Sequence, residues 1–261
     1  VTMQEDQSVL EEVVVVGYGT QTRKTVTSAI SKMDGKTLES MPVNLVGDGM
    51  KGRIGGLQVA TTDATPGSAP KFLIRGGSSI NNSNDPIVLV DGAVREMAGL
   101  NPNDIESIEV LKDAASAGIY GSRASNGVIL ITTKKGKEGR VRVNYSNSTT
   151  FSHPFVMPKF QNTYGTSEIE PMMSWGSKLA TPTSYDPADF FQTGFNETNS
   201  VGLSAGTERN QTYASASAVN SRGIVPNNVY NRYNFSIRNT TMLIKDRLTL
   251  DVLSLIHISE P

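Results

Sequence analysis

The second half of the chain alternates apolar and polar residues over several short segments. In the first of them, Val141, Val143 and Tyr145 are each followed by a polar residue. A period of two residues is typical of a β-strand with one apolar and one polar face. Similar segments lie at 200–206, 232–238 and 248–252, with a fifth, Ala- and Ser-rich candidate at 213–220. Taken alone, this pattern favours a soluble antiparallel sandwich with one solvated side.

The connections between these segments favour a membrane barrel instead. Their lengths alternate: a long link at 152–197, a tight one at 208–210, a longer one at 221–229 and a tight one at 245–247. Outer-membrane barrels combine short periplasmic turns with longer extracellular loops. A barrel whose chain enters from the periplasm requires this parity. We therefore expect Val143, Phe235 and Leu250, on the apolar faces, to contact lipid.

Composition limits the possible functions. The chain has 261 residues, with 24 Lys and Arg against 25 Asp and Glu, and no cysteine. Its near-zero net charge gives no electrostatic reason to expect nucleic acid as a partner. The lack of cysteine excludes disulfides and thiolate metal sites. No apolar run reaches the roughly 18–20 residues of a membrane-spanning helix. Barrel strands contain no such run either, because their lipid-facing and lumen-facing residues alternate.

The first half reads as a compact mixed α/β domain. Short strands bounded by Gly, Asn and Pro are expected at 72–75, 87–90 and 128–133, and a further strand at 25–33. Asp34 or Thr37 can start one short helix, Asn44 can cap a second that runs to about Met50, and a third is expected at 113–118. A small domain of this kind fits inside a wide barrel.

Near the N-terminus, four consecutive valines follow an acidic pair and precede Gly17-Tyr18-Gly19. Such a run is strongly β-prone. It fits either a buried core strand or a strand offered to another protein as an added edge. The run by itself leaves both interpretations open.

Six blocks follow in a fixed order along the first half. They are 42–45, 52–59, Phe72-Leu73-Ile74-Arg75-Gly76, 84–92, 101–113 and 119–134. In this order they resemble the plug domain of TonB-dependent outer-membrane transporters of the SusC/RagA type. The resemblance runs from about residue 11 to about residue 139, and the remainder resembles the first barrel strands of the same family.

The resemblance implies an α/β plug domain followed by the first five or so strands of a truncated antiparallel transmembrane β-barrel. We expect a remnant of an N-terminal extension at 1–10, a TonB box at 11–20, the plug at 21–138 and a partial barrel at 139–253. Plugged transporters use about 22 strands, so the sequence is expected to be a fragment. The tail at 254–261 departs from the alternation, and we predict that it is non-native read-through.

The function implied is active import of a nutrient, an oligosaccharide or a peptide, across the outer membrane of a Gram-negative bacterium. The expected partners are the periplasmic domain of TonB with its inner-membrane energising complex, a SusD-like surface lipoprotein that acts as a lid, the substrate and outer-membrane lipid. The N-terminus would be periplasmic. The TonB-interaction strand would comprise Glu12, Val13, Val14, Val15, Val16, Gly17 and Tyr18. The alternative is a periplasmic binding or signalling module that uses the same strand.

Motifs for catalysis are weak. Gly17-Tyr18-Gly19 begins like a dinucleotide fingerprint, but Thr22 stands where the third glycine is needed. His153 and His257 are far apart in sequence, and turn or cap roles explain the carboxylates between 91 and 113. We therefore predict no enzyme activity, no cofactor and no metal site. The resemblance further suggests that Arg75, Glu109 and Arg123 form ion pairs between plug and barrel.

Overall fold

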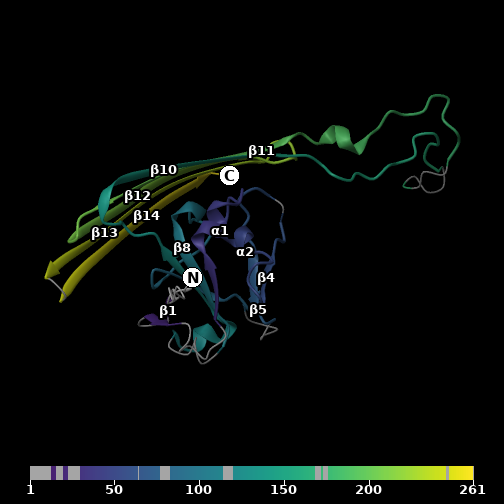
Figure 1. Ribbon diagram of the computed structural model, residues 1–261. Helices are drawn as coiled ribbons and strands as arrows, with labels where there is room; N and C mark the ends of the chain where they lie inside the picture. Colours follow the sequence, from purple (N-terminus) through teal and green to yellow (C-terminus); the bar gives the residue numbers. More distant parts are fainter. Residues whose placement is uncertain are drawn as a thin grey trace, which may run out of the picture.

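The computed structural model contains a long curved sheet and a smaller α/β unit packed against its concave side (Figure 1). We call the sheet the wall and the smaller unit the inner domain. The structure describes residues 13–15, 20–22, 30–63, 65–76, 83–113, 120–167, 172, 176–244 and 247–260.

The wall is a five-stranded antiparallel sheet in which each strand pairs with its neighbours in sequence. Its strands are β10 Gly139–Ser152, β11 Gly194–Gly206, β12 Asn210–Arg222, β13 Val229–Ile244 and β14 Leu248–Glu260. All five alternating segments of the sequence are thus strands of one meander, including the Ala- and Ser-rich segment in β12. This confirms the predicted start of an antiparallel barrel.

The two faces of the wall differ in chemistry as the alternation predicts. Val143, Phe235 and Leu250 lie on the face away from the inner domain, with 62%, 47% and 50% of their surface exposed. Ser200 and Ser236, on the opposite face, are buried under the inner domain. Successive side chains of a strand point to opposite faces. The register of each strand therefore determines both the residues on the outer face and those that face the inner domain.

The links follow the predicted parity. The long link between β10 and β11 projects from one end of the wall (Figure 1) and contains the short helix η5 Pro187–Phe190. The link between β12 and β13 lies at the same end, because β11 returns the chain to the other end. The tight turns before β12 and before β14 therefore share the opposite end.

The inner domain is built on a sheet with the order β3-β8-β9-β6-β7. Its strands are β3 Ile30–Asp34, β6 Ile87–Val90, β7 Ala93–Val94, β8 Ile105–Leu111 and β9 Val128–Thr133. The remaining elements are α1 Gly35–Glu39, α2 Val46–Met50, the hairpin β4 Leu57–Ala60 with β5 Lys71–Ile74, and the short helices η2 Pro102–Asp104 and η4 Ser122–Asn126. The helix expected at 113–118 falls mostly outside the described residues.

The core of the inner domain lies between its central strands and the two α-helices. Ile108 and Val110 of β8 are fully buried together with Val46 and Met50 of α2. Asp34 caps α1 as predicted, since its carboxylate accepts a hydrogen bond from the Lys36 amide at 2.9 Å. The start of α1 approaches β8 closely: a Cβ on Gly35 would lie 2.0 Å from the Ile105 carbonyl oxygen. Only glycine fits there. Within the described residues, no helix is long and apolar enough to cross a membrane.

Part of the valine run forms a strand outside these sheets. β1 Val13–Val15 pairs antiparallel with β2 Thr20–Thr22 in a separate two-stranded sheet. Residues 16–19 between them lie outside the described part of the chain. Val13–Val15 are therefore not a strand of the inner domain's central sheet.

The tail differs from the expectation. β14 runs to Glu260, and Ile256 and Ile258 continue the apolar outer face opposite Phe235 and Tyr233 of β13. The prediction that alternation stops before this tail is wrong, because the serine at 254 is one small residue within an otherwise continuous apolar row. The non-native origin of residues 254–261 stays a prediction.

The two faces of β10 allow a matched test. Val143→Arg places a charge on the lipid side, and we expect it to lower the free energy of unfolding of the membrane-inserted protein by up to about 2–4 kcal/mol, the cost at the bilayer midplane. Asn144→Arg, one residue along, places the same side chain on the inner face beside a charged cavity and should cost much less. Urea unfolding of the full-length protein in lipid vesicles measures both. Equal costs would show that the faces are assigned wrongly.

Candidate functional site: the interface between inner domain and wall

One wall strand provides a continuous row of contacts to the inner domain. Arg232, Asn234, Ser236 and Arg238 are alternate residues of β13 and therefore point to the same side. Each of them donates a hydrogen bond to the inner domain. β13 thus acts as the main attachment strand.

Arg232 joins two separate segments of the inner domain. Its side chain is 1% exposed, and its two terminal nitrogens each donate at 2.7 Å, Nη1 to the Ala98 carbonyl and Nη2 to the Asn44 carbonyl. Its Nε finds no acceptor among the described residues. The Asn44 side chain in turn bonds to Asn196 and Thr198 of β11. The turn at Asn44 is therefore held from two wall strands.

Asp104, at the end of η2, is a buried carboxylate that the wall surrounds with hydroxyl groups. It accepts hydrogen bonds from Tyr213 at 2.9 Å, from Ser215 at 2.6 Å and from Ser236 at 3.3 Å. Burial raises the pKa of Asp104 above its usual value, and the hydroxyl bonds and the charge of Lys134 only partly offset this.

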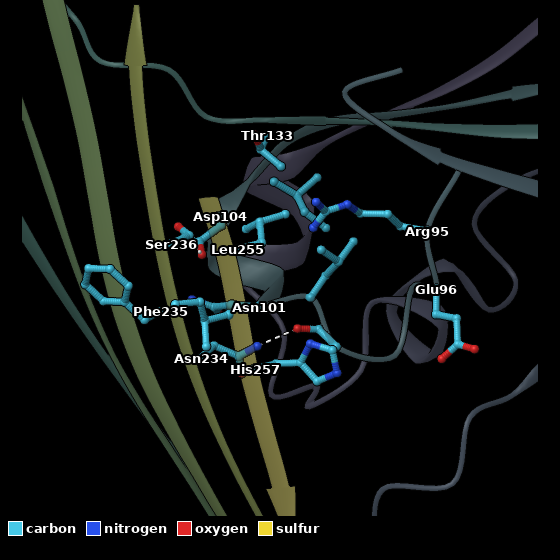
Figure 2. Close-up of a pocket in the computed structure, with 14 residues that line it drawn as sticks. Arg95, Glu96, Asn101, Asp104, Thr133, Asn234, Phe235, Ser236, Leu255 and His257 are labelled. Atoms are coloured by element: carbon cyan, nitrogen blue, oxygen red, sulfur yellow. Dashed lines mark hydrogen bonds between the residues drawn. The ribbon is translucent and has the colours of Figure 1, made fainter. Parts of the chain in front are cut away.

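Figure 2 shows this region beside a pocket of about 300 Å³. Asp104 and Ser236 lie together on one side of the pocket, and Arg95 and Glu96 extend from the other. Asn234 donates to the carbonyl of Gly99, and Asn101 donates to Ser200 of β11 at 3.0 Å. The whole segment from Ala98 to Asp104 is therefore attached to the wall through polar groups.

Arg238 forms an ion pair across the interface. Its Nη1 lies 2.8 Å from Asp91 of the inner domain, and its Nη2 lies 2.6 Å from Asp251 of β14. Nη1 also donates to the Thr133 hydroxyl at 3.0 Å and lies 3.3 Å from the Thr133 carbonyl. Asp91 adopts a positive φ of 48° at the turn after β6 and accepts bonds from the amide and hydroxyl of Thr133. Asp91 thus lies in a turn, as predicted, and it also binds Arg238 of the wall, which its sequence context does not indicate.

The residues predicted to form such pairs have other partners. Arg75 lies 2.6 Å from Asp113, and Glu109 lies 3.9 Å from Lys32, both inside the inner domain. Glu109 stands opposite Lys32 in the β3–β8 register, so its side chain lies beside a cation of the inner domain. The side chain of Arg123 falls outside the described part of the structure. Wall contacts of these three residues stay a prediction.

A second part of the interface is a gap. A cavity of about 610 Å³ separates β3, α1 and β8 from the inner face of β10–β12. Its lining includes the cations Lys32, Lys36, Lys134, Lys135, Lys137 and Arg142 and the carboxylates Asp34, Glu39, Glu106 and Glu109. The described ranges contain no group of three or more His, Asp or Glu arranged to hold a metal ion.

The comparisons with known proteins agree with this architecture. Residues 22–128 match the family model of the TonB-dependent receptor plug domain. The TonB-dependent receptor SusC of Bacteroides thetaiotaomicron is 33% identical over a region that covers 97% of this chain and 26% of SusC. The chain belongs to the SusC/RagA-type TonB-dependent receptors. The inner domain is accordingly the plug domain, and the wall is the start of the receptor barrel.

Further relatives support the assignment. The TonB-dependent receptor P39 of Formosa agariphila is 35% identical, over 91% of this chain and 24% of its own length. A chain of the RagAB peptide importer in its 'open-open' state superposes with a TM-score of 0.79 at 27% identity, covering 95% of this chain and 32% of that one. The chain spans about a quarter of the length of these curated relatives.

The ion pair at Arg238 makes a prediction for stability. Arg238→Met leaves Asp91 buried without its cation, and we expect a loss of about 3–5 kcal/mol in the free energy of unfolding. The double variant Asp91→Asn with Arg238→Met removes both charges of this pair and should recover much of that loss, because the remaining Asp251 is one-third exposed and lies 3.8 Å from Lys135. Urea unfolding of the full-length receptor in vesicles tests this. If the double variant loses as much as the sum of the two single variants, no coupling exists.

Asp104 makes a prediction for pH dependence. Because its pKa is raised in the docked plug, the folded state holds the proton at pH values where the unfolded state has released it. Its contribution is therefore neutral below the usual pKa of 3.8 and becomes destabilising as the pH rises through the folded-state pKa. Asp104→Asn should remove this decline with pH. Identical pH slopes of the unfolding free energy for the native and variant receptors would contradict the assignment.

Proposed function

We propose that this chain forms the plug and first barrel strands of an importer that takes up a nutrient across the bacterial outer membrane in a TonB-dependent manner. The observation that carries the proposal is the wall, which has an apolar outer face and a polar inner face that a folded domain occupies. A barrel filled in this way conducts nothing until the plug moves. The apolar outer face also argues against a soluble periplasmic signalling module.

The chemistry of the interface suits a plug that must move. The contacts between plug and wall described above come from Ser, Thr, Asn, Tyr and Arg of β11, β12 and β13. Neutral hydrogen bonds contribute only about 0.5–1.5 kcal/mol each, and those to charged groups about 1.5–3 kcal/mol, because water replaces them when they break. A polar interface therefore separates into water at lower cost than an apolar one.

We propose that residues 12–18 act as the TonB box. Within the described residues β1 pairs with β2 alone, and we propose that its other edge accepts a further strand. The periplasmic domain of TonB would add to this edge through main-chain hydrogen bonds. The inner-membrane energising complex would then pull on the N-terminal end of the plug.

The outer partners follow from the family and from the long link. The similar RagAB structure is that of a peptide importer. We propose an oligosaccharide or a peptide as the substrate of this protein. We place a SusD-like lipoprotein lid at the end of the wall where the β10–β11 link projects. Phe155 and Phe160 are exposed aromatic residues on that link, as a protein partner would require. The N-terminus would face the periplasm, and the protein would act without enzyme activity.

Proline substitutions in β1 test the coupling role. Proline lacks the N–H that an added strand needs, so Val14→Pro or Val15→Pro must remove one bond to the partner. We expect both variants to insert and to bind substrate at the cell surface, and at least one to fail in import. Val14→Thr and Val15→Thr keep the donor and should import at near-normal rates.

Surface binding and uptake are measured side by side on cells that express each variant. If the valines are instead a core strand, proline abolishes binding and uptake together, and the coupling assignment fails.

A further inference from the structure

The outer face of the wall changes from apolar to polar toward the end from which the long link projects (Figure 1). Along β10, the apolar residues Val143 and Tyr145 are followed on the same face by polar residues. The same change occurs at matching positions of β11, β12 and β13. The polar positions are Asn147, Thr149, Glu197, Asn199, Asn220 and Asn231, which we call the amide patch.

The strand register brings the side chains of the amide patch together. Asn147 stands opposite Asn199, and Asn220 stands opposite both Glu197 and Asn231. Side chains directly opposite each other in antiparallel strands have Cβ atoms about 4.5–5.5 Å apart, close enough to interact. The patch therefore extends across four strands as one surface.

Hydrogen bonds within and beside the patch hold its side chains in place. Asn199 Oδ1 accepts from the Asn147 amide and from the Tyr145 hydroxyl, each at 2.8 Å. Asn220 Nδ2 donates to Asn231 Oδ1 at 3.0 Å. Side-chain amides and hydroxyls both donate and accept hydrogen bonds. The ordered patch therefore offers both kinds of partner to a ligand.

The patch lies at the height of a lipid headgroup. Asn147 and Thr149 follow Tyr145 on the same face of β10, and aromatic residues mark the membrane boundary of barrels. At about 3.3 Å per residue and a strand tilt of about 35–45°, the two positions lie about 5–11 Å above Tyr145. The polar zone on each side of a bilayer is about 5–8 Å thick. The patch therefore meets headgroups and not acyl chains.

The charge of the patch distinguishes between kinds of headgroup. Its six residues include one carboxylate, Glu197, and no cation. Arg222, the next outward residue of β12, donates to Gln192. A phospholipid phosphate would meet the carboxylate without the cation that phosphate groups prefer. The hydroxyl and amide groups of a sugar instead match the neutral Asn and Thr side chains.

We propose that the amide patch binds the sugar headgroup of a glycolipid in the outer leaflet of the membrane. The acyl chains of the glycolipid lie along the apolar face at Val143 and Phe235, and the patch binds the sugar above them. The inference rests on the proposed orientation in the outer membrane, in which the long link faces the cell exterior. It gives the wall a lipid ligand distinct from the imported substrate.

Purified lipid A, whose headgroup is a glucosamine disaccharide, is the probe. The full-length receptor is placed in vesicles of phosphatidylethanolamine and phosphatidylglycerol with increasing amounts of lipid A, and bound lipid is measured by native mass spectrometry. Asn147→Leu and Asn199→Leu each remove one amide of the patch at similar volume. Asn239→Leu is the matched control, because Asn239 lies on the same face at the opposite end of the wall and also bonds to its neighbours, Asn210 and Thr212.

We expect the native receptor to retain lipid A in preference to both phospholipids. Each patch variant should weaken lipid A binding about three- to tenfold, as the loss of one or two neutral hydrogen bonds predicts. Asn239→Leu should bind lipid A as the native receptor does. Lipid A from which the phosphates have been removed should bind equally well.

Three results would overturn the inference: no preference for lipid A, the same loss in Asn239→Leu as in the patch variants, or loss of binding when the phosphates are removed. Resistance of the wall to added protease reports insertion into the vesicles. An inserted receptor that gives any of these results contradicts this inference alone. A native receptor that fails to insert contradicts the membrane placement, and with it the proposed import.

Discussion

The alternation of side chains along five long strands is the constraint from which the rest of this structure follows. Every residue of the wall that faces outward is matched by neighbours that face inward. The outward-facing row contains apolar residues such as Val143 and Phe235. The inward-facing row contains polar residues, among them Ser200, Ser215 and Ser236. The plug therefore meets a wall of hydroxyl, amide and guanidinium groups. Its apolar core is formed mainly by its own elements, including β8, β9 and α2, and Leu255 of β14 is a wall residue that packs against it.

The two buried arginines of β13 attach the plug by different chemistry. Arg238 is balanced by the carboxylates of Asp91 and Asp251. Arg232 donates to two backbone carbonyls, and none of the ion pairs found in the described residues involves it. Carbonyl oxygens are present at any position whatever the side chain, so Arg232 fixes the path of the backbone at Asn44 and Ala98. Arg238 instead selects particular side chains, and it fixes the register between plug and wall.

Much of the fold could be read from the sequence, because the signals are local. A period of two residues predicts the wall strands, and the lengths of the links predict at which end of the wall each link lies. β6 and β9 are short apolar runs between glycines and prolines, and they fall where predicted. The docking residues could not be found in this way. Asp91 and Arg238 are 147 positions apart, and Asp104 gives no sign that Tyr213 and Ser215 surround it. For Arg75 and Glu109 the structure shows ion pairs with Asp113 and Lys32 inside the plug, and their predicted pairs with the barrel stay a prediction.

A short segment of chain joins the plug to the wall. β9 ends at Thr133 and β10 begins at Gly139, and the link is itself held, by the Lys134 amide on the Asp104 carbonyl and by the Lys137 amide on Ser204. Arg238 also donates a hydrogen bond to the Thr133 hydroxyl. A plug tethered so closely to its docking surface experiences it at a high effective concentration. Redocking of a plug that had left the wall would therefore be a unimolecular step, with a rate that does not depend on the amount of protein.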